Sequence, residues 1–79
     1  MKLDTKNGDR GRVWDRDAGA WFEQQWVRAE LDDHTGRGWV EYYAKSPSGN
    51  YWLNPDGSYE VRKARGRFLF FREKEEVAS

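Results

Sequence analysis

The single histidine of the chain is the first residue to consider for chemistry. His34 follows Asp32 and Asp33, and an imidazole beside carboxylates can act as an acid or base or bind a metal ion. A metal site needs several converging ligands, however, and the sequence has no second histidine and no cysteine. We therefore interpret residues 32–38, which contain two aspartates and two glycines, as a solvated turn rather than a reactive centre.

The other carboxylates do not form a catalytic motif. Asp15 and Asp17 lack the spacing of a calcium-binding loop. The sequence also contains no nucleophile elbow, no phosphate-binding loop and no dinucleotide fingerprint. A chain of 79 residues leaves little room for a cleft between two catalytic carboxylates. We expect a protein that binds rather than catalyses, without a catalytic residue, a cofactor or a metal.

The clearest charge asymmetry lies in residues 61–72, which contain no acidic residue. The basic residues of this segment are Arg62, Lys63, Arg65, Arg67 and Arg72. Basic residues interleaved with aromatic rings are typical of proteins that bind single-stranded nucleic acid, and residues 65–70 partly match the RNA-recognition core pattern. In the competing interpretation, Phe68 and Phe70 are core residues of a strand whose arginines are solvated.

A second aromatic group flanks the loop at residues 46–50. Its members are Trp39, Tyr43, Tyr51 and Trp52. Exposed Trp, Tyr and Arg side chains dominate the hot spots of protein interfaces. Exposed rings also stack on sugars, which keeps a carbohydrate-binding module among the alternatives. In a domain this poor in Leu and Ile, the same rings are also candidates for the core.

We predict one convex partner-binding face that draws on both groups. Its anchors are Trp39, Tyr43 and Trp52. Its charged contacts are Arg62, Arg65 and Arg67, because a guanidinium can pair with a carboxylate through two parallel hydrogen bonds. A nucleic-acid-binding module that uses residues 61–72 is the first alternative, and a carbohydrate-binding module is the second.

The composition indicates one small domain that must position these residues. The chain has 14 basic and 14 acidic residues, and 16% of its residues are aromatic. The zero net charge argues against a uniformly basic nucleic-acid coat or a uniformly acidic DNA mimic. The longest wholly apolar run, residues 68–71, is too short to cross a membrane. No internal repeat is apparent, and we expect a monomer or a small homo-oligomer.

Turn signals at short intervals predict an all-β fold, a small antiparallel meander or partly open barrel of five to six strands. The turn signals lie at residues 7–8, 17–19, 32–38, 46–50, 54–57 and 65–66. The expected strands are residues 12–16, 21–31, 38–45, 51–54, 58–64 and 67–72. The alternative is an α+β fold with one helix at 18–33 packed on an antiparallel sheet, because that segment is rich in helix formers. Residues 1–10 and 73–79 are expected to be loose ends.

The general profile resembles small phage-encoded host-takeover proteins of the anti-CRISPR kind. The features in common are a short, single-domain chain that starts at its own Met1, lacks cysteine and a secretory signal, and is rich in Arg, Trp and Tyr. The resemblance implies a protein of the host cytoplasm that occupies the surface of a bacterial effector complex. Its partner would then be a CRISPR effector subunit, and it would block DNA binding or nuclease recruitment.

Overall fold

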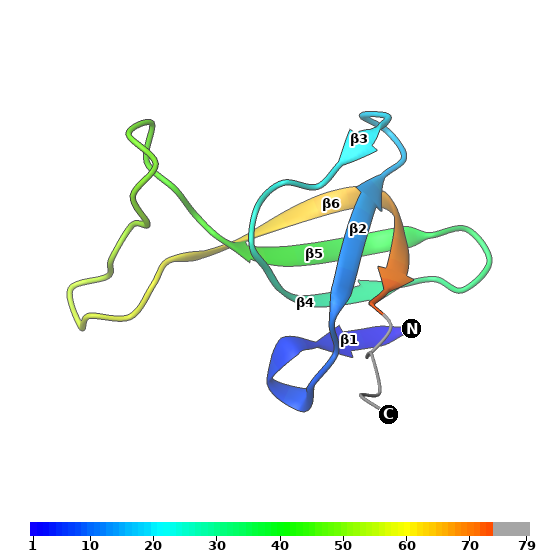
Figure 1. Ribbon diagram of the computed structural model, residues 1–79, viewed down its shortest axis with the longest axis horizontal. Coiled ribbons are helices and arrows are strands. Elements are labelled where there is room, and N and C mark those ends of the chain that lie inside the picture. The colour runs from blue at the N-terminus through cyan, green and yellow to red at the C-terminus, as the bar shows by residue number, and fades with distance from the viewer. Residues whose placement is uncertain (74–79) are drawn as a thin grey trace, which may run out of the picture.

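A computed structural model describes residues 1–73 as six antiparallel strands in one open sheet, with the strand order β1-β4-β5-β6-β2-β3 (Figure 1). The strands are β1 (Lys2–Asp4), β2 (Gly11–Asp15), β3 (Ala20–Trp21), β4 (Trp26–Leu31), β5 (Arg37–Tyr43) and β6 (Val61–Arg72). A single turn of 3-10 helix, η1 (Thr5–Asn7), follows β1. The all-β prediction is confirmed. The predicted meander describes only β4, β5 and β6, since β2 joins the far side of β6.

The alternative helix at 18–33 is wrong, because that segment contains β3, a loop and β4. In β4 the side chains of Val27, Ala29 and Leu31 are buried, whereas Arg28 and Glu30 are exposed. This alternation has the period of two of a half-buried strand. It outweighs the helix propensity of the surrounding Ala, Glu and Gln residues, which is a weak preference by comparison with burial.

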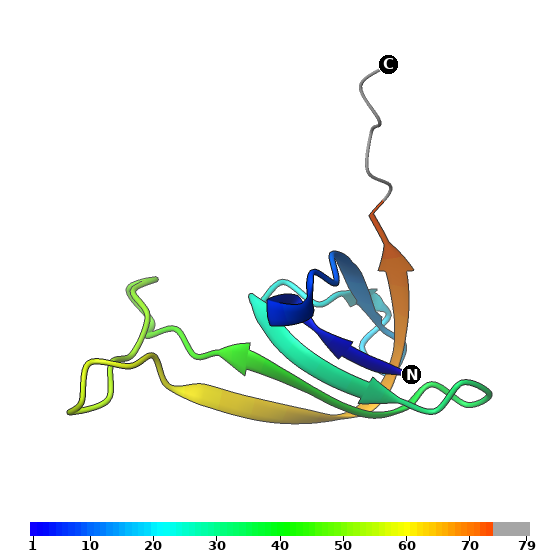
Figure 2. The ribbon, with the colours of Figure 1, turned by 90° about the horizontal axis from the view of Figure 1, so that it is seen from below.

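Strand β6 holds the two halves of the sheet together. Its first part, residues 61–67, pairs with β5, and its second part, residues 68–72, pairs with β2. Figure 2 shows that β6 bends sharply between these parts, so that β2 and β3 stand above the end of the β4–β5 layer. The predicted turn at residues 65–66 is wrong: the expected strands 58–64 and 67–72 form one strand of 12 residues.

The surroundings of Gly66 explain why strand β6 contains a glycine at this position. It lies opposite Gly38 of β5, and a Cβ atom at this position would lie 2.9 Å from Oδ2 of Asp17. The missing side chain lets the loop after β2 approach the backbone of β6. This glycine therefore serves close packing at the bend rather than a reverse turn.

The core lies on the inner face of this bent sheet. Its buried residues are Leu3, Val13, Ala29, Leu31, Val40 and Phe68, and Phe22, Trp26, Ala64 and Phe70 pack around them. Aliphatic side chains thus fill the centre and rings surround it in edge-to-face contacts, with centroids 6.1 Å apart for Phe22 and Phe68 and 5.6 Å for Trp26 and Phe70. Rings support the core as expected, but Phe68 is the only buried ring in the described residues.

The N-terminal ten residues are not the loose arm that their polarity suggested. Strand β1 pairs with β4, and Leu3, which lies opposite Ala29, is only 3% exposed. The predicted turn at residues 7–8 is confirmed, and it returns the chain toward β2. The burial of the Leu3 side chain in the core thus explains why the short strand β1 is ordered. At the other end, the backbone N–H of Glu73 donates to the Arg10 carbonyl; residues 74–79 lie outside the described residues.

Residues 44–60, which we call the lobe, project from the sheet beyond the last β5–β6 pair, Tyr43 and Val61 (Figure 1). The lobe contains two equivalent turns eight residues apart. In the first, Ser46 donates to Asn50 and Gly49 donates to Ser46; in the second, Asn54 donates to Ser58 and Gly57 donates to Asn54. Both predicted turns are confirmed. The sequence repeat that underlies them, Tyr-x-x-[Ser/Asn]-Pro-x-Gly-[Asn/Ser], was not anticipated.

Three backbone hydrogen bonds close the lobe into a ring. Ala44 N–H donates to the Glu60 carbonyl, Trp52 to Ala44, and Glu60 to Trp52, each over 3.0 Å. The strand expected at 51–54 is wrong, and the strand expected at 58–64 begins only at Val61, since residues 51–60 form only isolated bridges. In this ring each of the three segments bonds to both of the others at a single residue. No two segments therefore run side by side long enough to form a β-ladder.

Candidate binding surface

Three tyrosines at the eight-residue spacing meet at the base of the lobe: Tyr43, the last residue of β5, and Tyr51 and Tyr59 of the lobe. The ring centroids of Tyr43 and Tyr51 are 6.0 Å apart, those of Tyr43 and Tyr59 5.4 Å, and those of Tyr51 and Tyr59 5.4 Å. The Tyr51 hydroxyl donates to Oε1 of Gln25 over 3.0 Å, which ties the lobe to the loop before β4. These contacts hold the lobe in one shape without a core of its own.

The apolar side chains around this cluster point to solvent. Trp52 is 46% exposed, Leu53 62%, Tyr59 51% and Val61 42%. In contrast, Ala44 is the one buried residue of the lobe, and the lobe supplies no member of the central core. Tyr59 still packs in the tyrosine cluster, whereas Trp52, Leu53 and Val61 belong neither to that cluster nor to the central core. Folding therefore does not account for these three apolar residues. A clustered group of exposed apolar side chains is a common mark of an interaction site.

The outer face of β5 and β6 continues from the lobe as a row of cations. Lys63, Arg65 and Arg67 project from the same side of β6 and are all exposed. In register they lie opposite Glu41, Trp39 and Arg37, respectively. The Lys63 ammonium lies 4.3 Å from the centre of the Trp39 ring, so this ring is half-buried beneath a cation rather than free.

The predicted partner-binding residues divide into three locations. Trp39, Tyr43, Arg65 and Arg67 share the outer face of the sheet, and Trp52 lies on the adjoining lobe. Arg62 lies on the opposite face of the sheet from Arg65 and Arg67. Side chains alternate along a strand, so Arg62 points away from the side on which Val61 and Lys63 project. Its guanidinium pairs with Glu60 over 3.1 Å.

The predicted partner-binding set left out Lys63, a basic residue of the 61–72 segment that projects outward, and included Arg62, which does not. It also missed Leu53, Tyr59 and Val61 as the exposed apolar group. The eight-residue recurrence of tyrosine was the signal for this lobe. Tyr59 and Val61 lie in the strand expected at 58–64, yet both are exposed, at 51% and 42%, and neither belongs to the central core.

The aromatic residues of the RNA-recognition pattern are not available for stacking. Phe68 is 2% exposed and lies in the central core, and Phe70 packs against it. The core interpretation of these two rings is thus confirmed.

The turn between β4 and β5 is held by one carboxylate. Oδ1 of Asp32 accepts the backbone N–H groups of His34 and Thr35, each over 2.9 Å. These bonds hold the pKa of Asp32 below its ordinary value. His34 is exposed in this turn, as expected for a solvated loop. No group of metal-binding side chains converges within residues 1–73.

Asp17 fastens the β2–β3 loop to the bend of β6. Its Oδ1 accepts Nε of Arg67 over 2.9 Å, its Oδ2 accepts the Arg67 backbone N–H over 3.1 Å, and Nη2 of Arg67 lies 2.8 Å from Oδ1. The side-chain hydrogen bond from Arg67, followed by the backbone one, lowers the pKa of Asp17 from its ordinary value of 3.8. The loop is therefore attached by a charge-assisted clamp.

We expect this clamp to weaken in acid. A lowered folded-state pKa means that Asp17 stabilises the fold fully above pH 3.8, its ordinary value, and that this contribution is lost as the pH falls through the lowered pKa. Urea unfolding of the wild type and Asp17→Asn should show a difference at neutral pH that disappears in strong acid. Glu23→Gln, which changes an exposed carboxylate without a clamp, is the control. An equal difference at every pH would contradict the prediction.

Comparisons with known proteins add no relative to this geometry: no protein-family model, no curated protein and no solved structure matches the chain. Within residues 1–73, no helix is long and apolar enough to span a membrane.

Proposed function

We propose that this chain is a non-catalytic binding protein that inhibits a partner by occupying the partner's surface. The observation that carries the proposal is the lobe, which exposes Trp52, Leu53 and Tyr59 although it contributes nothing to the central core. Apolar groups that do not stabilise the fold gain free energy only when a partner covers them, at about 25 cal/mol per Å² of apolar surface removed from water.

The surroundings of the lobe support a protein as the partner. Lys63 and Arg65 flank the apolar group on the same side of the sheet, which gives an apolar centre beside a charged rim, the usual arrangement of a protein interface. We propose a bacterial defence effector, such as a CRISPR effector subunit, as this partner. The proposed site of action is the host cytoplasm, and the proposed mechanism is steric block of DNA binding or nuclease recruitment.

The geometry favours a protein over single-stranded nucleic acid. Stacking on bases needs free ring faces along the cationic row. Trp39 is the ring next to Arg65, and the Lys63 ammonium covers it. Phe68 and Phe70 belong to the core and its border. The cations between residues 62 and 67 thus lack interleaved exposed rings, and the exposed ring of β6, Phe71, lies beyond the bend in edge contact with Trp21.

Leu53→Asp should abolish or strongly reduce inhibition. A charge at the centre of a desolvated contact typically costs 2 kcal/mol or more, which is about 30-fold in affinity. The measurement is the plating efficiency of a targeted phage on bacterial strains that each carry one type of CRISPR effector and express the wild-type or variant chain. Leu69→Asp is the matched control, because Leu69 is also exposed, at 41%, but lies on the β2-paired half of β6.

Two results would count against the proposal. If the wild type raises plating in no strain, the proposed class of partner is wrong. If Leu53→Asp and Leu69→Asp reduce plating equally in a responsive strain, the lobe is not the contact surface. Circular dichroism of both variants checks that the sheet remains folded.

A further inference from the structure

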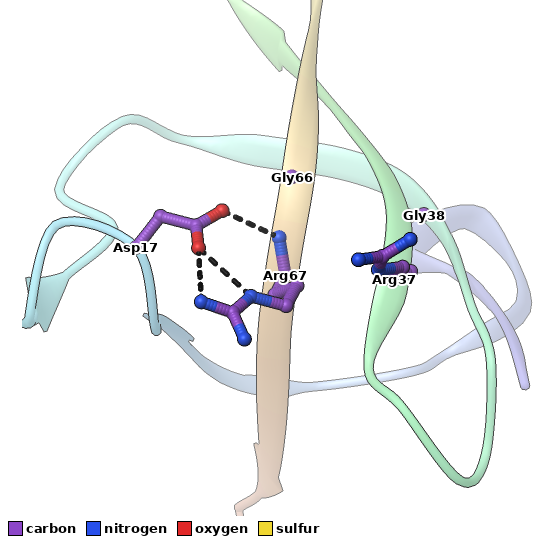
Figure 3. A pocket seen from close by; sticks show the side chains of 5 residues that line it. All are labelled: Asp17, Arg37, Gly38, Gly66 and Arg67. Carbon is purple, nitrogen blue, oxygen red and sulfur yellow. Dashed lines mark hydrogen bonds and ion pairs between the residues drawn. The ribbon is translucent and has the colours of Figure 1, made fainter.

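A depression on the molecule lies at the bend of β6, away from the lobe. It has a volume of about 590 Å³ and is lined by Asp17, Arg37, Gly38, Gly66 and Arg67 (Figure 3). Its side chains come from the β2–β3 loop and from the paired strands β5 and β6. Gly38 and Gly66, which lie opposite each other in the pairing of β5 with β6, add no side chain to this lining.

The register places two guanidinium-bearing residues directly opposite each other. Arg37 of β5 pairs with Arg67 of β6, and like charges in such a pair destabilise a sheet. The Arg67 side chain turns toward Asp17 and away from Arg37 (Figure 3). In the described part of the chain, no carboxylate pairs with the Arg37 guanidinium, whereas Arg67 is compensated.

The depression therefore carries an excess of positive charge. Arg16 adds a third guanidinium nearby, since its Nη1 lies 3.4 Å from the Thr35 carbonyl two residues before Arg37. Both oxygens of Asp17, the one carboxylate in the lining, already accept hydrogen bonds from Arg67. Asp17 thus offsets Arg67 and leaves the donors of Arg37 free for another group.

We propose that this depression binds an oxyanion, a phosphate or carboxylate group, through the guanidinium of Arg37. The planar fork of an arginine matches two oxygens of either group. The bound group would offset the positive charge of Arg37 and Arg67, which face each other at the bend. The contact of Arg67 with Asp17 would keep the β2–β3 loop in place as one side of the depression. This site is separate from the lobe, so it stands independently of the proposed inhibition.

Titration of the folded protein with inorganic phosphate and, separately, with acetate tests the site. Sodium chloride keeps the ionic strength constant, and amide chemical shifts are the readout. We expect saturable shifts at residues 16–17, 36–38 and 66–67. Arg37→Ala should weaken phosphate binding about tenfold, the loss typical of one charge-assisted hydrogen bond, and Arg37→Lys should give a smaller loss. Arg10→Ala removes an equal charge away from the depression as the control.

The outcomes separate a built site from general attraction. Local shifts with both anions assign an oxyanion site that accepts either source, and local shifts with phosphate alone assign a phosphate site. The proposal fails if no saturable shift occurs at these residues. It also fails if Arg37→Ala and Arg10→Ala weaken binding equally, because net charge alone then explains the attraction.

Discussion

Replacing residues 44–60 by Asn-Gly is expected to leave a folded sheet that no longer inhibits its partner. Tyr43 and Val61 form the last β5–β6 pair, and a two-residue Asn-Gly turn joins paired antiparallel strands directly. The residues of the central core all lie outside the lobe, and Ala44 is the one buried residue that the replacement removes. The fold therefore loses little, whereas the proposed contact loses Trp52, Leu53 and Tyr59 together.

This shortened variant separates the two roles of the chain. Amide spectra and thermal unfolding should show the sheet intact, and phage plating should fall to the level without inhibitor. A variant that keeps the lobe but exchanges each turn proline for alanine, Pro47→Ala with Pro55→Ala, controls for altered loop chemistry. If the shortened variant still inhibits fully, the contact surface lies on the body of the sheet. If it does not fold, the lobe has a structural role that its exposed side chains do not reveal.

Phe68→Ala is expected to remove most of the stability of the domain. Phe68 is 2% exposed, lies in the central core and occupies the first position of β6 that pairs with β2. Truncation of a buried phenylalanine typically costs about 3–5 kcal/mol. That cost is comparable with the whole stability of a small domain, at roughly 0.05–0.15 kcal/mol per residue.

Phe71→Ala provides the matched control in the same strand. Its ring is 51% exposed and makes one edge contact with Trp21, with centroids 5.5 Å apart. We expect this change to cost about 1 kcal/mol. Thermal unfolding should give a midpoint lower by more than about 12 °C for Phe68→Ala and by only about 4–8 °C for Phe71→Ala. If both variants lowered the thermal midpoint equally, the loss of stability would depend on the position of both residues in the bent strand β6 rather than on the burial of the ring.

Local patterns were sufficient to predict much of this fold. The strand expected at 21–31 contains β4, and the proline- and glycine-containing turns at 46–50 and 54–57 were placed correctly. At Gly49 and Gly57 the φ angles are 89° and 88°, a conformation that glycine adopts at little cost. These features depend on neighbouring residues alone, which is why one sequence reveals them.

Features that depend on contacts distant in sequence were not predictable in the same way. Gly66 had the signature of a turn, and only the approach of Asp17, 49 positions earlier, shows why a strand needs it. Likewise, the burial of Leu3 depends on its position opposite Ala29 in a strand pairing that its polar neighbours conceal.

For the candidate binding surface, the types of residue were predicted better than their placement. The sequence directed attention to Trp, Tyr and Arg near the lobe, but the boundary between two expected strands was in error by several residues. The expected strand at 58–64 contained both Arg62 and Lys63, but the grouping of Arg62 with Arg65 and Arg67 disregarded the alternation that places Lys63 outward and Arg62 on the opposite face. The proposed anion site was missed because it arises from the pairing of Arg37 with Arg67 across two strands.

The position of β6 has a consequence for synthesis of the protein. It is the final strand of the described chain, and it supplies a neighbour to both β5 and β2. During translation, neither half of the sheet can be completed until residues near 72 have left the ribosome tunnel. Until then β1 to β5 remain an incomplete sheet whose edges are open to chaperones, and folding should be completed in one late step once β6 has emerged.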